Sequence, residues 1–125
     1  MDRLFIMLGS FNAFLAVGFG AFGAHGLKAR IPIEMLTVYQ TGVHYHLFHA
    51  IALLCIGLLA QNWSGSFYLK VSGWLLLTGI ILFSGSLYAL SMSGLRYFGL
   101  ITPFGGMAFL VGWVFLILAA WQVHV

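Results

Sequence analysis

Apolar residues dominate the chain, and its few charged positions divide it into four long uncharged stretches. The stretches are residues 4–27, 35–69, 71–95 and 97–125. A helix needs roughly 20 apolar residues to cross the hydrocarbon core of a bilayer, so each stretch is long enough for one crossing. The strands of a membrane β-barrel would instead alternate over segments of about ten residues. The pattern therefore predicts an all-α, polytopic membrane protein with four transmembrane helices.

Proline and polar residues set the expected boundaries of these helices. We expect membrane spans at about 4–24, 43–60, 68–91 and 102–121, within a single transmembrane domain over residues 1–125. Pro32 and Glu34 suit the first turn of a helix, because proline needs no backbone N–H there and an acid complements the helix N-terminus. A short interfacial helix is therefore predicted at about 32–41, with a bend at Gly42 before the second span.

Composition agrees with a lipid-facing surface. Of the 125 residues, 62% are hydrophobic and 6% are charged, and the mean hydropathy is +1.07. A soluble domain carries about 25% charged residues, because its surface must face water. The net charge of +3 comes from basic residues that stand singly, whereas nucleic-acid binding needs them clustered on one face. The expected partner is the lipid bilayer and not nucleic acid.

The basic residues also predict an orientation. With four spans, Arg3 and Lys70 lie on the side of both termini, and Lys28, Arg30 and Arg96 lie on the other side. Basic residues are enriched in cytoplasmic loops. We therefore expect the first and third loops in the cytoplasm and both termini outside.

Small residues that recur on one helix face predict the surfaces through which the helices pack, at steps of four in the first and third spans and along one stripe in the fourth. Such stripes mark contact faces in lipid, where close approach drives association. The stripes comprise Asn12, Ala16, Gly20 and Ala24; Gly85, Ala89 and Ser93; and Gly105, Ala108, Gly112 and Ala119. They fit contacts inside one bundle, a homo-oligomer, or contacts with a larger membrane complex. Asn12 is in addition expected to form an interhelical hydrogen bond worth about 1 kcal/mol.

Histidines are the most unusual polar feature of the chain. On a helix, His46 and His49 lie about 60° apart on one face, and His44 points nearly opposite to His46. His25 ends the first span and reaches the same membrane end if the first two helices are antiparallel neighbours. A site built from His25, His46 and His49 is therefore conceivable, while His124 is interpreted as a solvated residue.

Three roles remain open for these histidines. Histidine is a common metal ligand and a proton carrier near neutral pH, and ionisable residues at membrane depth tend to serve function. Metal or haem ligation is one role, a proton or small-solute site is the second, and structural hydrogen bonding is the third. Two histidines three residues apart supply half a metal site, and no carboxylate lies within the spans. The cofactor therefore stays unknown.

Motifs of enzymes are missing from the sequence. There is no nucleophile elbow, phosphate-binding loop, metalloprotease helix or carboxylate pair. The single cysteine, Cys55, forms no internal disulfide or dithiol pair. An enzyme acting on lipid with histidine as base would lack a nucleophile, so the sequence favours a protein that is not an enzyme.

Four ordered strings resemble a known family. They are GAFGAHGL at 20–27, the Tyr39–Gln40 to His49–Ala50 run, FSGSLY at 83–88, and Ile101–Thr102–Pro103 with Gly105–Gly106 and Gly112–Trp113. Together they resemble the YwdK/YgdD family of small membrane proteins. The resemblance implies four spans and a bacterial inner-membrane or, in eukaryotic relatives, mitochondrial location, and it implies no activity. The motifs include His25, Gln40, His46, His49, Ser84, Ser86, Thr102 and Pro103.

Two functional hypotheses follow. In the first, a polar cluster at one membrane end binds a small solute, a proton or a metal. Its candidate ligand-binding residues are His25, Gln40, His46, His49, Ser84 and Thr102. In the second, the protein is a structural or assembly subunit that packs with itself or with a larger membrane complex.

Overall fold

The computed structural model describes residues 2–123, which form helices joined by short turns and contain no strand. The elements are α1 (Asp2–Phe22), the π-helical turn η1 (Gly23–Leu27), α2 (Ile33–Ala60), α3 (Phe67–Gly79), the π-helical turn η2 (Ile80–Ser84), α4 (Gly85–Ser93), the 3-10 turn η3 (Arg96–Leu100) and α5 (Thr102–Gln122). The segments Asp2–Leu27, Ile33–Ala60, Phe67–Ser93 and Arg96–Gln122 are long and apolar enough to cross a membrane. The predicted all-α fold with four membrane-spanning helices is confirmed.

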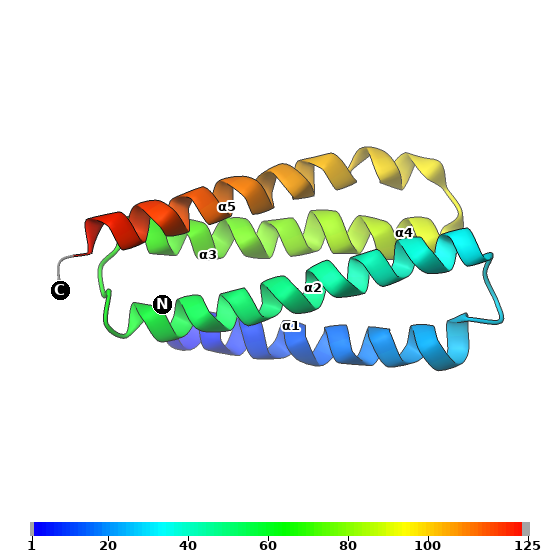
Figure 1. Cartoon of the computed structure of the whole chain (residues 1–125), viewed down its shortest axis with the longest axis horizontal. Coiled ribbons are helices and arrows are strands. Elements are labelled where there is room, and N and C mark those ends of the chain that lie inside the picture. Colours follow the sequence, from blue (N-terminus) through cyan, green and yellow to red (C-terminus); the bar gives the residue numbers. More distant parts are fainter. Residues whose placement is uncertain (1, 124–125) are drawn as a thin grey trace.

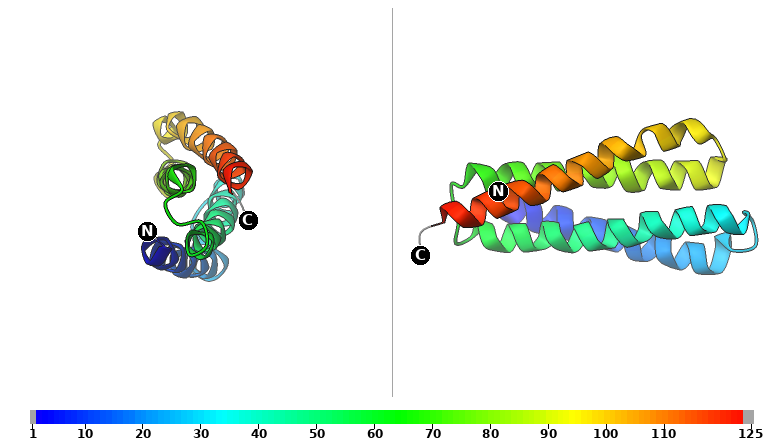
Figure 2. Two further views of the ribbon diagram at one scale, coloured as in Figure 1. Left: turned by 90° about the vertical axis from the view of Figure 1, so that its left-hand side faces the viewer. Right: turned by 45° about the horizontal axis from the view of Figure 1, so that its top comes forward.

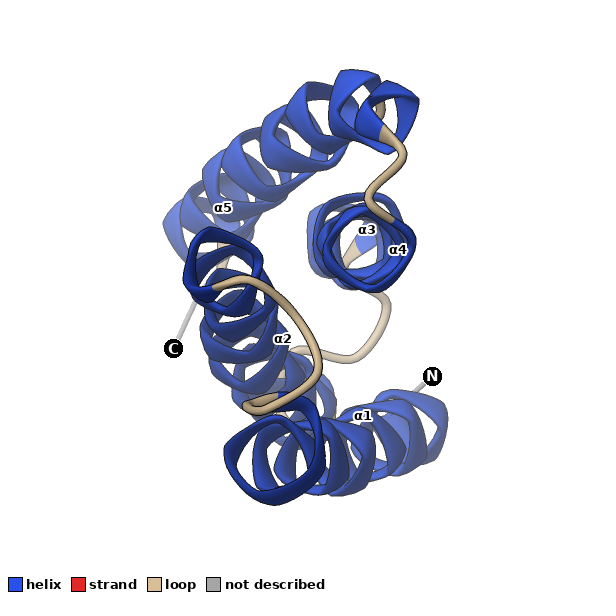
Figure 3. Ribbon diagram, turned by 90° about the vertical axis from the view of Figure 1, so that its right-hand side faces the viewer, coloured by secondary structure: helices blue, strands red, loops and turns tan. Residues whose placement is uncertain are grey.

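The four long segments alternate in direction, so the start of α1 and the end of α5 lie at the same end of the molecule (Figure 1). α1 packs along α2, and α3 packs along α5. These two antiparallel pairs meet where α2 contacts η2 and α4 (Figure 2). Seen end-on, α1 and α5 lie on opposite sides of the molecule, and the bundle is an open arc (Figure 3).

α2 differs from its prediction, because it runs through Gly42 without interruption. The segment at 32–41 is therefore not a separate helix; from Ile33 it is the first part of α2. Gly42 is buried, and a Cβ built there would lie 3.0 Å from the ring of Tyr88. The glycine at this position makes room for a neighbouring aromatic ring, and the helix direction does not change.

α1 and α2 approach each other so closely that their backbones touch. A Cβ added to Gly9 would lie 2.6 Å from the backbone nitrogen of Leu54 and 2.8 Å from the carbonyl oxygen of Ala50. A Cβ added to Gly57 would lie 2.7 Å from the backbone nitrogen of Ile6. Small residues permit this approach, and close packing is what holds helices together in lipid.

Aromatic rings that pack directly against glycines make further contacts between the helices. The pairs are Phe5 on Gly73, Tyr39 on Gly23, Tyr88 on Gly42, and Phe109 on Gly79. In each pair the ring occupies the space that a side chain on the glycine would need. The rings therefore set how the helices face one another.

The predicted small-residue stripes are only partly buried. Asn12 and Ala16 of the first stripe are buried, and so are Gly105, Gly112 and Ala119 of the last. The stripe on α4 points away from the core: Gly85 has no neighbour within 4 Å of a built Cβ, and Ser93 is exposed. The buried residues of α4 are Ser86, Tyr88 and Ser91 instead.

Candidate functional site

His46 lies at the centre of a buried polar network that joins three helices. Its Nε2 is 3.0 Å from Oδ1 of Asn12 on α1, and its Nδ1 is 2.9 Å from the hydroxyl of Tyr88 on α4. Asn12 in turn donates from Nδ2 to the carbonyl of Leu8 at 2.8 Å. The predicted interhelical hydrogen bond of Asn12 is confirmed, and its partner is His46.

The Leu8 carbonyl determines the direction of every bond in this network. Because a carbonyl oxygen only accepts, the group of Asn12 that faces it is the amide nitrogen, and the Asn12 oxygen faces His46. An amide oxygen only accepts, so Nε2 of His46 carries a proton. In the neutral ring Nδ1 is then the acceptor, and the Tyr88 hydroxyl donates to it. Both nitrogens of His46 are thus bonded to protein groups.

His49 faces a different neighbour, although it is only one turn further along α2. Its Nδ1 is 2.8 Å from the carbonyl of Tyr45, and its Nε2 accepts from the indole nitrogen of Trp113 on α5 at 3.0 Å. The ring is stacked on Phe109, with the two centroids 3.6 Å apart. His46 and His49 are 3% and 4% exposed, so both are buried, but they contact different helices and do not form one site.

The partners of His49 require one protonation state. The Tyr45 carbonyl only accepts, so Nδ1 carries a proton. The Trp113 indole only donates, so Nε2 has a free lone pair. A second proton on Nε2 would face the indole N–H, and the hydrogen bond to α5 would be lost. His49 is therefore a neutral histidine with the opposite tautomer from neutral His46.

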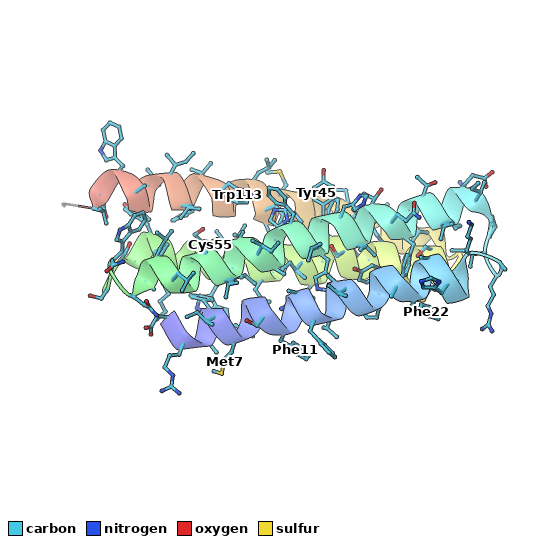
Figure 4. All side chains as sticks on the ribbon, turned by 60° about the horizontal axis from the view of Figure 1, so that its bottom comes forward. Met7, Phe11, Phe22, Tyr45, Cys55 and Trp113 are labelled. Atoms are coloured by element: carbon cyan, nitrogen blue, oxygen red, sulfur yellow. The ribbon has the colours of Figure 1, made fainter. Side chains whose placement is uncertain are left out.

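His49 and Trp113 line a groove between α2 and α5 that has a volume of about 710 Å³. Its walls are mainly aromatic and include Tyr45, Phe48, Phe83 and Phe109. Figure 4 shows the labelled Tyr45 and Trp113 where α2 and α5 face each other. Tyr45 and Phe48 are 44% and 64% exposed, so the groove opens sideways, toward the lipid that surrounds a membrane-spanning helix.

A second cavity of about 350 Å³ follows the first along the same two helices. Phe48 and Trp113 belong to the walls of both cavities. Beyond them the second cavity is lined by Ile51, Ala52, Cys55, Ile56, Leu59 and Leu116. The two cavities thus form one track between α2 and α5, with polar atoms at one end and an apolar continuation.

The other predicted site residues do not join this track. His25 on η1 and Gln40 on α2 are exposed. Ser84 donates to the carbonyl of Gly42 at 2.8 Å, and Thr102 pairs with the hydroxyl of Ser86 at 2.5 Å. The two hydroxyl contacts link α2 to η2 and α4 to α5. The predicted polar cluster at one membrane end is therefore not assembled in this arrangement.

Ligand positions for a metal are not assembled either. Residues 2–123 contain no group of three or more His, Cys, Asp or Glu side chains that could hold one metal ion. His25 is exposed, whereas His46 and His49 use all four of their ring nitrogens in protein hydrogen bonds. These residues do not fit a metal or haem site, and His124 lies outside the described residues.

Sequence reasoning missed the residues that form the groove. His44, which the sequence placed nearly opposite to His46 on the helix, is exposed and lines the groove. Trp113, Phe109 and Tyr45 carried no signal beyond their aromatic character, which is common in membrane helices. The spacing of Phe109 and Trp113, four residues apart on one helix face, was the one pattern that pointed to a shared surface.

These features define a small multi-pass helical membrane protein. The chain belongs to the family described as "Protein of unknown function (DUF423)", whose profile matches residues 19–106. It is 50% identical to the UPF0382 membrane protein YwdK of Bacillus subtilis over 118 residues. The aligned region covers 94% of this chain and 96% of that relative.

Two staphylococcal proteins are also similar. The UPF0382 membrane protein SAB0533 of Staphylococcus aureus is 46% identical over 120 residues, covering 96% of this chain and 97% of the relative. The UPF0382 membrane protein SSP2132 of Staphylococcus saprophyticus is 43% identical over 123 residues, covering 97% of this chain and 99% of the relative. No solved structure matches. The resemblance to the YwdK/YgdD family is confirmed.

Proposed function

We propose that this protein binds a small lipophilic molecule, taken up sideways from the bilayer, in the groove between α2 and α5. The observation that carries the proposal is the hydrogen-bonded pair of His49 and Trp113 in the wall of an aromatic groove that opens to lipid. Ligand sites are typically concave, mostly apolar, and provided with a few polar groups that orient the ligand.

The difference between the two buried histidines supports this choice. His46 links α1, α2 and α4 through two side chains, so structural hydrogen bonding accounts for it. His49 makes its side-chain bond across a boundary where the helices leave about 710 Å³ open. Polar groups at membrane depth are costly and tend to mark functional sites. The predicted solute-binding role is therefore assigned to His49.

A photoreactive alkyl probe tests the proposal. In vesicles, the probe should label residues of α2 and α5 that line the groove more strongly than lipid-facing residues such as Met7 and Phe11, which point away from the bundle in Figure 4. Gly106→Leu should reduce this labelling, because a Cβ there meets only Phe83, at 3.9 Å, and the longer side chain fills the groove.

Gly85→Leu is the matched control. It adds the same side chain to a helix, and a Cβ at Gly85 has nothing within 4 Å, but Gly85 does not line the groove. Labelling in this variant should equal that of the unmodified protein. Uniform labelling of all lipid-facing residues, unchanged by Gly106→Leu, would contradict the proposed function.

A second candidate function is assembly with itself or with a larger membrane complex. It is favoured by the small residues Gly85, Ala89 and Ser93 on α4, which point away from the described bundle core. Native mass measurement would test it, as would crosslinking through Ala89→Cys in a chain whose exposed Cys55 is replaced by serine. A monomer without crosslinked partners would contradict it.

For location, we propose the cell inner membrane, with the loops at 28–32 and 94–101 in the cytoplasm and both termini outside. Support comes from Lys28, Arg30 and Arg96, which outnumber Arg3 and Lys70. Compartment reporters fused to either terminus would test the orientation, and a cytoplasmic C-terminus would contradict it.

A further inference from the structure

We propose that the molecule bound in the groove is an uncharged amphiphile with a hydroxyl-bearing ring and an apolar chain, of the alkylphenol class. This inference rests on the proposed function and specifies the ligand. It follows from three properties of the track between α2 and α5: its polarity along the helices, the donor and acceptor at its polar end, and its aromatic walls.

The track has a polar end and an apolar end. The first cavity is lined by His49, the Trp113 that donates to it, and the exposed residues His44 and Tyr45. Past Phe48 and Trp113, the second cavity offers aliphatic side chains and the thiol of Cys55. From residue 44 to residue 59 of α2 the track is roughly 20 Å long, at 1.5 Å per residue. This shape matches a molecule with one polar head and one extended chain.

The hydrogen bond between Trp113 and His49 selects the head group. A ligand atom that inserts between them meets a donor, the indole N–H, and an acceptor, the free lone pair on Nε2 of His49. A hydroxyl satisfies both, because its oxygen accepts and its hydrogen donates. A ketone or an ether accepts only and would leave the buried His49 nitrogen without a donor, which is costly. Insertion of the hydroxyl requires the ring of Trp113, which is half-buried, to shift away from His49.

The walls of the first cavity favour a ring as the bearer of that hydroxyl. Tyr45 lies 4.6 Å from Phe83 between ring centroids, and Phe83 lies 5.5 Å from Phe109. Aromatic rings gain from stacked and edge-on contacts at such separations. The Nδ1 of His49 is held by the Tyr45 carbonyl, which keeps the Nε2 lone pair directed at Trp113. A planar phenol therefore finds both its ring contacts and its hydrogen-bond partners in one cavity.

The experiment compares 4-nonylphenol, its methyl ether and nonylbenzene as competitors of the photoreactive alkyl probe in vesicles. Affinities are expressed per mole fraction of competitor in the membrane, so that partitioning cancels. We expect the phenol to bind roughly tenfold more tightly than the ether, the effect of about one well-formed hydrogen bond. Nitrogen NMR of labelled histidine and of the indole should show that the phenol shifts the signals of His49 Nε2 and Trp113.

Variants separate this inference from the proposed function. His49→Phe should abolish most of the preference for the phenol, because it removes the acceptor to which only the phenol can donate. His25→Phe, which makes the same change at an exposed histidine outside the groove, should keep the preference. Equal affinities for all three compounds, still reduced by Gly106→Leu, would overturn the alkylphenol class and leave the proposed function standing. No competition by any compound, together with labelling insensitive to Gly106→Leu, would overturn both.

Discussion

Two regions of α2, one helical turn apart, differ in how closely the neighbouring helix packs against them. Around His46, α1 packs against α2 with backbone contact at Gly9, and we call this contact the seam. Both ring nitrogens of His46 are hydrogen-bonded there, to Asn12 and to Tyr88. Around His49, α5 reaches α2 through the rings of Trp113 and Phe109, and a groove of about 710 Å³ remains beside them. The same residue type therefore joins three helices in one region and borders an accessible cavity in the other.

Residue size on the facing helix accounts for the difference. α1 presents Gly9, Asn12 and Ala16 to α2, and these small side chains allow the helices to meet. α5 presents Phe109 and Trp113 in the groove, and these rings hold the helices apart. Helices in lipid gain stability from close packing and little from hydrophobic burial, so bulky rings leave a gap that nothing else closes.

The largest expected effect contrasts two glycines. Gly9→Leu should lower the free energy of unfolding by about 3 kcal/mol, because the new side chain meets the backbone of α2 and neither helix can yield. Gly106→Leu should change it by less than about 1 kcal/mol, because the groove has room. Unfolding in mixed detergent micelles measures both, and similar losses would contradict the distinction between a closed seam and an open groove.

Removal of the seam histidine should have the next largest effect. His46→Leu leaves Oδ1 of Asn12 and the Tyr88 hydroxyl buried without their partner, and we expect a loss of about 2 kcal/mol. The double variant Asn12→Leu/His46→Leu should recover part of this loss, because it removes one unpaired group. A double-mutant cycle of unfolding free energies measures the coupling, and strict additivity would show that the network is not a unit.

A smaller effect is expected on the groove side. Trp113→Phe should cost about 1 kcal/mol, since it removes one hydrogen bond and keeps most of the ring. Nitrogen NMR should show a changed Nε2 signal for His49 and an unchanged signal for His46. A shift of both histidines would mean that the two regions are not independent.

The smallest effects should come from the exposed polar residues. His25→Ala and Gln40→Ala each change side chains that lie outside both regions, so stability should change by no more than about 0.5 kcal/mol. Labelling of the groove by the alkyl probe should also stay the same. A marked loss of labelling in either variant would restore the polar cluster at the membrane end as the binding site.

The spacing of charges and the length of apolar runs were enough to predict the four membrane-spanning helices, because the cost of burying a charge in lipid acts on each segment separately. The small residues of α1 likewise predicted the face that carries Asn12. The prediction of a bend at Gly42 was wrong, because this glycine makes room for the ring of Tyr88 within a continuous helix. The small-residue stripe of α4 was expected at a helix contact, and it points away from the core.

The partners of the two histidines depended on tertiary structure. Their spacing put them about 60° apart on one helix face, and this agrees with their shared burial. Which side chain each one meets depends on how far each neighbouring helix approaches and on its rotation, and these are set by pairs such as Phe5 on Gly73 and Phe109 on Gly79. Residues 60 or more positions apart in the chain, such as His49 and Trp113, meet only because of that packing, so the groove, the tautomers and the open side of the bundle follow from the tertiary structure.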